Sequence, residues 1–429
     1  MNTKSDSLLS ILNTLIKPAL GCTEIGIVAY ACGVCSKYAT GKITSVDVKV
    51  SQYVFRNVAC VGVPNLGFCG IKTIVAGGLF VKEPEKKLQI LSSIKQEDIP
   101  AIKKLLPYIN VEVVKNVDPV YTSVLLKTDK GEVIESLIEQ IHDNLIYVKY
   151  NGKDINISYL QNKKTIDEQS SNEKKYKCSD FSLNDIYDFS NKCNSNDIDF
   201  LFEADKLNEL LVDYGEKNNP STSLGKVFSK TIDGKENWED KILIALSNAV
   251  STRMAGCPLV VDSSNGSGDH GLTVTIPLYI YSEIFKLDKI ELLRACAFSH
   301  LILWKIKQNI GDLSAWCGSV VGAVVASAAG IAYLQKLPLA SINKLINFLL
   351  CSFGGILCDG AKPSCSNKIF SAYASAFTIL RLEHYNIDSI GGQGIINEDC
   401  FKTIESLGRI SQKSKDVLVD EIIKNIEVK

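Results

Sequence analysis

Apolar residues recur at helical spacing at the beginning of the chain and throughout its second half. Residues 5–17 form a helical pattern that Pro18 ends, and a second apolar helix is predicted from Thr23 to Tyr38. Beyond about Trp238, Gly- and Pro-marked loops separate apolar stretches, which predicts helices over 239–254, 272–286, 289–307, 318–335, 339–357, 364–384 and 397–426. The second half is therefore expected to form an all-α body.

Between these helical regions the pattern changes to an alternating one. From Ile43 the sequence ITSVDVKVSQYVFRNVACVGVP is strand-like, and a Gly-rich stretch then leads into IVAGGLFV. An amphipathic helix near 97–106 precedes the strand candidates VEVVKN, YTSVLLKT and LIYVKYNGKDINISYL. These elements predict a small α/β insert with an antiparallel sheet. Residues 161–197 are rich in Lys, Asn, Ser and Asp, which is typical of an exposed connection.

Together the patterns predict an α+β fold in which a mostly helical catalytic body, made of the N-terminal segment and the C-terminal half, carries a small inserted α/β domain. The expected ranges are an N-terminal part of the body, the insert, a polar linker with short helices and an all-α catalytic domain, at 1–81, 82–160, 161–237 and 238–429. The uncharged segment Cys317 to Leu334 consists largely of Gly, Ala, Ser and Val, which favours a closely packed buried helix over a membrane span.

Charge and composition narrow the class of ligand and the compartment. The formal net charge of the 429 residues is -1, so no long-range field favours nucleic acid or an anionic membrane, and small neutral or zwitterionic substrates stay open. Asp6 and Lys17 interrupt the first apolar run, unlike a signal peptide, and a cytoplasmic location follows. In such a reducing compartment the 14 cysteines are expected to be buried thiols, metal ligands or catalytic groups rather than disulfides.

Three cysteines lie beside polar or Gly-containing turns, in SAWCGSV, GILCDGAK and PSCSNK: Cys317, Cys358 and Cys365. The turn-forming residues between Cys358 and Cys365 allow both thiolates to face one point. The spacing matches neither a zinc finger nor a ferredoxin run, so metal binding and plain burial both stay open. Three thiolates on a cubane cluster would leave one iron free to act as a Lewis acid.

Cys22 lies just before the predicted helix that starts at Thr23. First-turn amides would stabilise its thiolate and favour a base or nucleophile, whereas the carboxylate of Glu24 would raise the thiol pKa. The outcome depends on where that carboxylate points.

A polar, Gly-rich segment, VDSSNGSGDHGLTVTIP, is a candidate for binding a substrate carboxylate through its backbone amides. A simple helix-entry turn is the alternative. Arg253 is a candidate carboxylate clamp, with a surface ion pair as the alternative, and His270, flanked by glycines, is a better candidate for substrate contact than His300 in its apolar helix. The predicted substrate-binding residues are Arg253, Asn265, Gly266, Ser267, Gly268 and His270.

Six ordered motifs, PALGCTE, STRMAG, NGSGDHGLTVTIP, IGDLSAWCG, ILCDGAKPSC and SLGRIS, resemble those of the L-cysteine desulfidase family, which is related to the catalytic α part of bacterial iron–sulfur L-serine dehydratases. The resemblance implies that Cys317, Cys358 and Cys365 hold an oxygen-labile 4Fe-4S cluster and that Cys22 is the catalytic base. The chain departs from the family at Asp269 and His270, where relatives commonly have Asn and Gln, and over residues 57–70.

The resemblance implies β-elimination of L-cysteine to sulfide and aminoacrylate, which gives pyruvate and ammonia. Two alternatives are kept: L-serine dehydration, and a non-catalytic iron–sulfur redox sensor. The expected partner is a small amino acid, with no nucleic acid and no membrane, and a homo-oligomer stays open.

Overall fold

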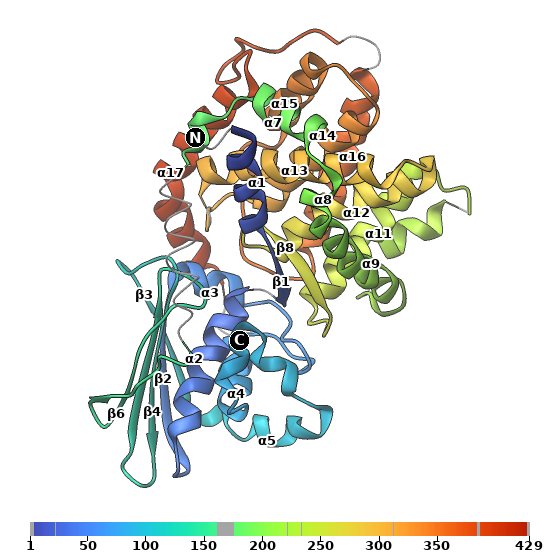
Figure 1. Ribbon diagram of the computed structural model, residues 1–429. Coiled ribbons are helices and arrows are strands. Elements are labelled where there is room, and N and C mark those ends of the chain that lie inside the picture. The colour runs from blue at the N-terminus through green and yellow to red at the C-terminus, as the bar shows by residue number, and fades with distance from the viewer. Residues whose placement is uncertain are drawn as a thin grey trace.

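The computed structural model describes residues 4–21, 23–160, 176–220, 222–232, 234–311, 313–383 and 387–426. It confirms the α+β fold: a helical body stands over a smaller part built on a six-stranded sheet (Figure 1). The apolar core runs through both parts and through the junction between them.

The sheet is mixed, with the strand order β3-β2-β4-β5-β6-β7. Its strands are β2 (Ile43–Ser51), β3 (Ile109–Val114), β4 (Tyr121–Thr128), β5 (Val133–Glu139), β6 (Leu145–Tyr150) and β7 (Lys153–Asp154). All pairs are antiparallel except β2 with β3, which is parallel. The expected antiparallel sheet is therefore corrected at that pair. Because β2 comes from the range 1–81, the sheet also extends across the predicted boundary at residue 82.

Helices cover one face of this sheet. α2 (Thr23–Tyr38), whose bounds match the prediction, lies against β4 and β5, and α4 (Ile71–Phe80) lies beside α2 (Figure 1). The amphipathic helix expected near 97–106 is limited to α5 (Ile99–Lys103), between two short 3-10 turns that contain or precede prolines. The first residue of α2, Thr23, therefore lies at the junction of the two parts, while the rest of the helix packs on the sheet.

The strand expected to continue beyond Ser51 is wrong, because residues Gln52–Val58 form helix α3. The hydroxyl of Ser51 accepts a hydrogen bond from the amide of Val54 at 3.1 Å and caps the helix. This local cap outweighs the β-branched residues that follow it, since an alternating pattern is only a weak preference when a cap is available.

The helical body follows the predicted order. Its helices are α7 (Leu183–Lys192), α8 (Ser195–Ile198), α9 (Phe200–Asn218), α10 (Leu224–Phe228), α11 (Trp238–Met254), α12 (Gly268–Phe285), α13 (Lys289–Ile310), α14 (Val325–Leu334), α15 (Leu339–Phe353), α16 (Cys365–Glu383) and α17 (Cys400–Lys424). The predicted helix 318–335 begins as a π-helical turn, Gly318–Val324. α9 is longer than the short helices expected for 161–237, and it packs against α11.

One strand interrupts the predicted all-α half. β8 (Val260–Ser264) pairs antiparallel with β1 (Ile16–Leu20), which follows α1 (Lys4–Leu15). The prediction that Pro18 ends the first helix is wrong, because α1 ends at Leu15 and Pro18 lies within β1, opposite Asp262. In a two-stranded sheet every strand is an edge strand, where a proline is tolerated. The pairing joins the start of the chain to the polar segment that opens α12.

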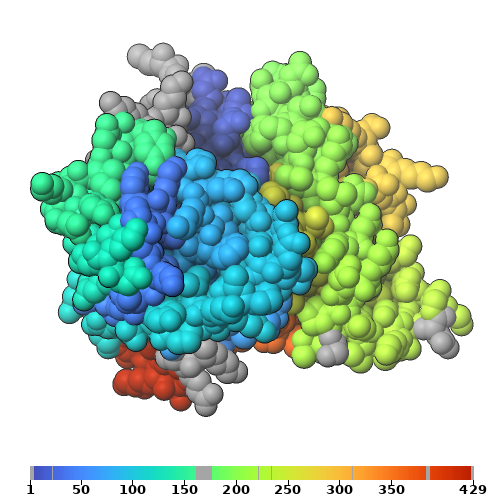
Figure 2. All heavy atoms as spheres, turned by 90° about the horizontal axis from the view of Figure 1, so that it is seen from below, coloured from blue at the N-terminus to red at the C-terminus, as the bar shows by residue number. Residues whose placement is uncertain are grey.

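The helical body and the sheet-bearing part contact each other along the junction. Seen from below, the cyan part of the chain lies beside the yellow-green part (Figure 2), and the amide of Gly62 donates to the carbonyl of Met254 at 2.9 Å. No helix in the described ranges is long and apolar enough to cross a membrane.

Candidate functional site

The glycine-rich segment forms a tight loop between β8 and α12. The amide of Ser264 donates to the carbonyl of Ser267 at 3.0 Å and the amide of Ser267 donates back at 3.1 Å. Asn265 and Gly266 lie between them at positive φ, 48° and 77°. The amide of Asn265 also donates to the carbonyl of Leu15 at 3.0 Å, which fixes the loop to the N-terminal segment.

Arg253 lies behind this loop as a buried ion pair. Its Nη1 donates to Asp269 Oδ1 at 2.8 Å, its Nη2 donates to the carbonyl of Gly21, and its side chain is 3% exposed. Its guanidinium fills the space beside Gly268, where an added Cβ would come within 2.3 Å of it. Both terminal nitrogens are used and the charge is paired with Asp269, whereas the buried Nε has no hydrogen-bond partner. The geometry favours a positioning role for Arg253.

Burial and pairing act in opposite directions on the partner carboxyl. Burial raises the pKa of Asp269, and the guanidinium of Arg253 lowers it again. The negative charge of Asp269 in turn raises the pKa of the Cys365 thiol, so the glycine loop interacts electrostatically with one of the predicted cluster ligands. Because both side chains of this ion pair are buried, the alternative of a surface ion pair for Arg253 is excluded.

His270 connects the glycine loop to the cysteine turns. Its Nδ1 lies 3.2 Å from the carbonyl of Ser264, and a Cβ added to Gly318 would lie 2.5 Å from its Nε2. Burial, followed by the charge of Lys307, lowers the pKa of His270 to about 3, so the ring is neutral at pH 7. Because a carbonyl only accepts, Nδ1 carries the proton, and Nε2 is an acceptor beside Gly318.

His300 lies inside α13, 1% exposed, with Nδ1 2.8 Å from the hydroxyl of Ser264. Burial lowers its pKa to about 3. It is a buried, hydrogen-bonded residue that supports the glycine loop from below.

Two of the three predicted cluster ligands lie on facing segments. Trp316 and Leu357 form an antiparallel bridge, in which the backbone amide of Cys317 donates to the carbonyl of Ile356 at 2.7 Å and that of Cys358 donates to the carbonyl of Ala315 at 2.8 Å. Side chains alternate along such a bridge, so Cys317 and Cys358 share the face opposite Trp316 as diagonal neighbours, which are roughly 7–8 Å apart in antiparallel pairs.

The third, Cys365, begins α16. Its Sγ donates to the carbonyl of Gly360 at 3.6 Å, and Gly360 has a φ of 96°, which turns the chain between Cys358 and Cys365. The thiols of Cys317 and Cys358 both contribute to raising the pKa of Cys365, behind burial and Asp269. The structure thus brings all three predicted ligands into one neighbourhood.

The spacing of the three cysteines bears on whether they could hold a single ion or a cluster. Within the described ranges, no group of three or more His, Cys, Asp or Glu is arranged to hold one metal ion. Cysteines that bind a cubane lie on separate irons and stand farther apart than the ligands of one ion, so diagonal spacing suits them. Burial, followed by the nearby Cys358 thiol, raises the pKa of Cys317 to about 11, and a metal would therefore have to displace its proton.

Two lysines adjoin the same turns. Lys362 and Lys368 contact Asp359 Oδ1 at 2.6 and 2.7 Å. Burial raises the pKa of Asp359, but these two ammonium groups outweigh it and hold the pKa at about 2. The charge of Lys362 also lowers the pKa of the Cys365 thiol, an effect smaller than that of burial.

Cys22, the predicted base, lies outside the described residues, although both of its neighbours are described. Gly21 accepts from Arg253, and the hydroxyl of Thr23 donates to the carbonyl of Gly266 at 3.4 Å. The chain on either side of Cys22 therefore contacts the Arg253 pair and the glycine loop.

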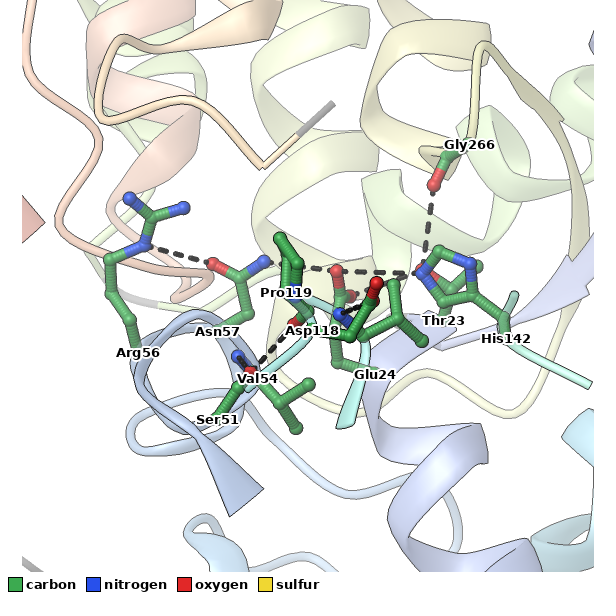
Figure 3. Close-up of polar contacts among 11 residues, drawn as sticks. Thr23, Glu24, Ser51, Val54, Arg56, Asn57, Asp118, Pro119, His142 and Gly266 are labelled. Carbon is green, nitrogen blue, oxygen red and sulfur yellow. Dashed lines mark hydrogen bonds and ion pairs between the residues drawn. The ribbon is translucent and has the colours of Figure 1, made fainter. Parts of the chain in front are cut away.

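A row of polar side chains that the sequence analysis did not select runs along the junction (Figure 3). Asn57 Nδ2 donates to Glu24 Oε1 at 3.0 Å, and Arg56 Nε donates to Asn57 Oδ1 at 3.4 Å. His142 Nε2, from the loop between β5 and β6, lies 3.9 Å from the same Glu24 oxygen. The carboxylate of Glu24 thus points towards Asn57 and His142. Its position in PALGCTE was the one signal for this row, because the other members come from distant segments.

The buried carboxyl of Asp262, in the strand β8 that leads into the glycine loop, should make the stability of the fold depend on pH. It is 7% exposed, and burial raises its pKa from 3.8 to about 6. A raised carboxyl pKa stabilises the folded state while the group is protonated, so this contribution is lost as pH rises from about 4 through 6. Asp262→Asn should therefore raise the thermal midpoint more at pH 7.5 than at pH 4.5, measured by circular dichroism. An equal change at both pH values would contradict this assignment.

The sequence is similar to known proteins along nearly its whole length. The family model described as serine dehydratase alpha chain matches residues 85–423. The chain is 31% identical over 428 residues to a UPF0597 protein of Porphyromonas gingivalis, with 97% of each chain covered. It is 31% identical over 429 residues to a UPF0597 protein of Clostridium perfringens, again with 97% of each covered, and 30% identical over 428 residues to one of Klebsiella pneumoniae, with 99% of each covered.

Proposed function

The chain belongs to the family of serine dehydratase alpha chains, and on that premise we propose that it is a lyase that eliminates the β-substituent of a small amino acid, with L-cysteine as substrate. The observation that carries this proposal is the meeting of the glycine loop with the cysteine turns, where His270 Nε2 lies against Gly318, the residue after Cys317.

The proposed cofactor is a 4Fe-4S cluster held by Cys317, Cys358 and Cys365. When bound, such a cluster would supply an iron without a protein ligand, which acts as a Lewis acid. The shared face of Cys317 and Cys358 and the proximity of Cys365 support this assignment. Other steps fall to the chain's own residues.

The glycine loop is proposed to contact the substrate through Asn265, Gly266, Ser267 and Gly268. The N-cap residue of α12, Ser267, makes no side-chain cap to the first-turn amides, and the buried Arg253–Asp269 pair fixes Asp269 in that first turn. The neutral His270 can accept a hydrogen bond at Nε2 from a donor group of the substrate. These contacts would orient the Cα–H bond and exclude water.

Cys22 is proposed as the base that removes the α-proton, a role that rests on the family resemblance. In the balanced reaction the Cα–H electron pair forms the new double bond as the Cβ–S bond breaks, and the sulfur leaves with its pair as sulfide. The 2-aminoacrylate that remains tautomerises to an imine, which water hydrolyses to pyruvate and ammonium.

L-Serine is the second candidate, and the description of the matching family favours it. Hydroxide is the poorer leaving group, so dehydration demands more assistance to the departing oxygen. The two substrates differ only in the atom on Cβ, which is sulfur in L-cysteine and oxygen in L-serine.

Anaerobically purified protein with L-cysteine should release sulfide and pyruvate in equal amounts, with a kcat/KM at least about tenfold above that for L-serine, which corresponds to roughly 1.4 kcal/mol. D-Cysteine is the matched control and should give neither product. Pyruvate from L-serine alone would identify a dehydratase. Iron and sulfide in the protein with no pyruvate from either amino acid would contradict a lyase and favour a redox sensor.

A further inference from the structure

Cationic side chains surround the glycine loop and the cysteine turns, and most of them have an anionic partner. Arg253 pairs with Asp269, and Lys362 and Lys368 contact Asp359. Arg56 differs from them. It is 2% exposed, and in the part of the chain that the structure describes it has no carboxylate partner.

The guanidinium of Arg56 is incompletely satisfied. Its Nε makes a 3.4 Å hydrogen bond to Asn57 Oδ1, and its Nη1 is buried without a hydrogen-bond partner. A buried guanidinium is strongly disfavoured unless an anion or several acceptors compensate its charge. A buried arginine with a donor still available is therefore suited to an anionic ligand.

Arg56 lies directly against the loop that joins two predicted cluster ligands. A Cβ added to Gly360 would come within 2.0 Å of the Arg56 carbonyl oxygen and 3.5 Å of its Cγ, and the carbonyl of Gly360 accepts from the Cys365 thiol. Helix α3 thus delivers the arginine to the cysteine turns from the sheet-bearing part, across the junction.

On the other side of Asn57 lies an opposite charge. Asn57 donates to Glu24 Oε1 at 3.0 Å, so one side-chain amide separates the guanidinium from the carboxylate (Figure 3). An α-amino acid carries an ammonium and a carboxylate group on the same Cα, so a cationic and an anionic side chain on either side of one amide can each face one of its two charges. The row Arg56, Asn57, Glu24 therefore offers a zwitterion one cationic and one anionic side chain.

We propose that Arg56 binds the α-carboxylate of the substrate and that Glu24 receives its ammonium group. The planar fork of Arg56 can hold both carboxylate oxygens, which a lysine cannot do. This inference rests on the proposed lyase function. It assigns the charged contact to Arg56, since the charge of Arg253 is already paired with Asp269, and it leaves the glycine loop to contact the rest of the substrate.

Binding of unreactive ligands tests the assignment apart from turnover. L-Alanine keeps both charges but has no leaving group, L-alaninamide lacks the carboxylate, and propionate lacks the ammonium. Isothermal titration of the iron-loaded wild type should show L-alanine binding at least about tenfold tighter than either analogue, as expected for charged hydrogen bonds. Equal affinity for L-alanine and L-alaninamide would overturn the proposal.

Variants then locate the two contacts. Arg56→Met should weaken L-alanine at least about tenfold and raise KM with little change in kcat, Arg56→Lys should be intermediate, and Glu24→Gln should remove the preference for L-alanine over propionate. Arg409→Met, at an exposed arginine of α17, is the matched control and should leave binding unchanged. Unchanged L-alanine affinity in iron-loaded Arg56→Met would overturn the proposal.

The assay distinguishes this proposal from the function on which it rests. Carboxylate-dependent L-alanine binding through Arg56, without pyruvate from either amino acid, would support the binding site and contradict the lyase. Turnover of L-cysteine by Arg56→Met with wild-type KM would support the lyase and contradict the site. Loss of iron from Arg56→Met with unaltered affinity of the loaded fraction would assign Arg56 to the cluster instead.

Discussion

Replacing Cys358 with serine should remove the cluster and the elimination activity together. Cys358 shares one face of the Trp316–Leu357 bridge with Cys317, and a serine hydroxyl is a far weaker ligand for iron than a thiolate. Anaerobically purified Cys358→Ser should be colourless, contain background iron and acid-labile sulfide, and release no pyruvate. Iron analysis, visible absorbance and a coupled pyruvate assay measure these three outcomes.

Cys351→Ser provides the matched control, because Cys351 is exposed on α15 only a few residues from Cys358. It should keep wild-type iron content and turnover. Full activity in a colourless Cys358→Ser protein would contradict a role for the cluster, and equal loss in both variants would point to general damage to this region.

Replacing Arg253 with methionine should destabilise the fold by about 3–5 kcal/mol, the range found when one partner of a buried ion pair is removed. Asp269 would be left without its 2.8 Å contact, and the carbonyl of Gly21 would lose its donor. Denaturant unfolding at pH 7.5 measures the free energy. The same variant should lose activity, since Arg253 donates to the carbonyl of Gly21 and its guanidinium fills the space beside Gly268 in the glycine loop.

The pH dependence of this variant has a defined sign. Without the guanidinium, burial alone acts on Asp269 and raises its pKa further. Arg253→Met should therefore be less destabilised at acidic pH, where Asp269 is protonated, and lose stability as pH rises towards neutral. Asp269→Asn added to Arg253→Met should recover part of the loss at pH 7.5.

Arg381→Met is the control for arginine removal, since Arg381 is 58% exposed in its ion pair with Glu239. Its effect should stay within about 1 kcal/mol. If Arg253→Met were no more destabilising than Arg381→Met, the buried pair would not be what holds the glycine loop.

The sequence predicted the elements that rest on local patterns. The helix Thr23–Tyr38 and the order of helices after Trp238 follow from apolar periodicity and from Gly and Pro between them. The run after Ser51 was mispredicted because one hydroxyl caps a short helix there. The parallel pairing of β2 with β3 also had no local signal, since it depends on how the connection between them crosses the sheet.

The site was predicted only in part, because some of its contacts join segments that are distant in the sequence. Motifs identified the three cysteines of the turns, the glycine loop, Arg253 and His270, which the structure brings to one region, although their roles stay predictions. Arg56, Asn57 and His142 were not selected, because nothing near them in the chain indicates that Glu24 lies beside them. A buried charge is recognisable only once its burial and its partners are known.

The division of this site between two bodies of the molecule limits what any fragment can do. A piece consisting of residues 238–429 would hold every cysteine proposed to bind iron, yet it would lack Arg56, Glu24 and the strand that pairs with Val260–Ser264. Assembly of an inorganic centre in such a piece would not restore recognition of an amino acid. Conversely, if Arg56 and Glu24 bind the substrate as proposed, any displacement of one body relative to the other would separate substrate recognition from the cysteine turns.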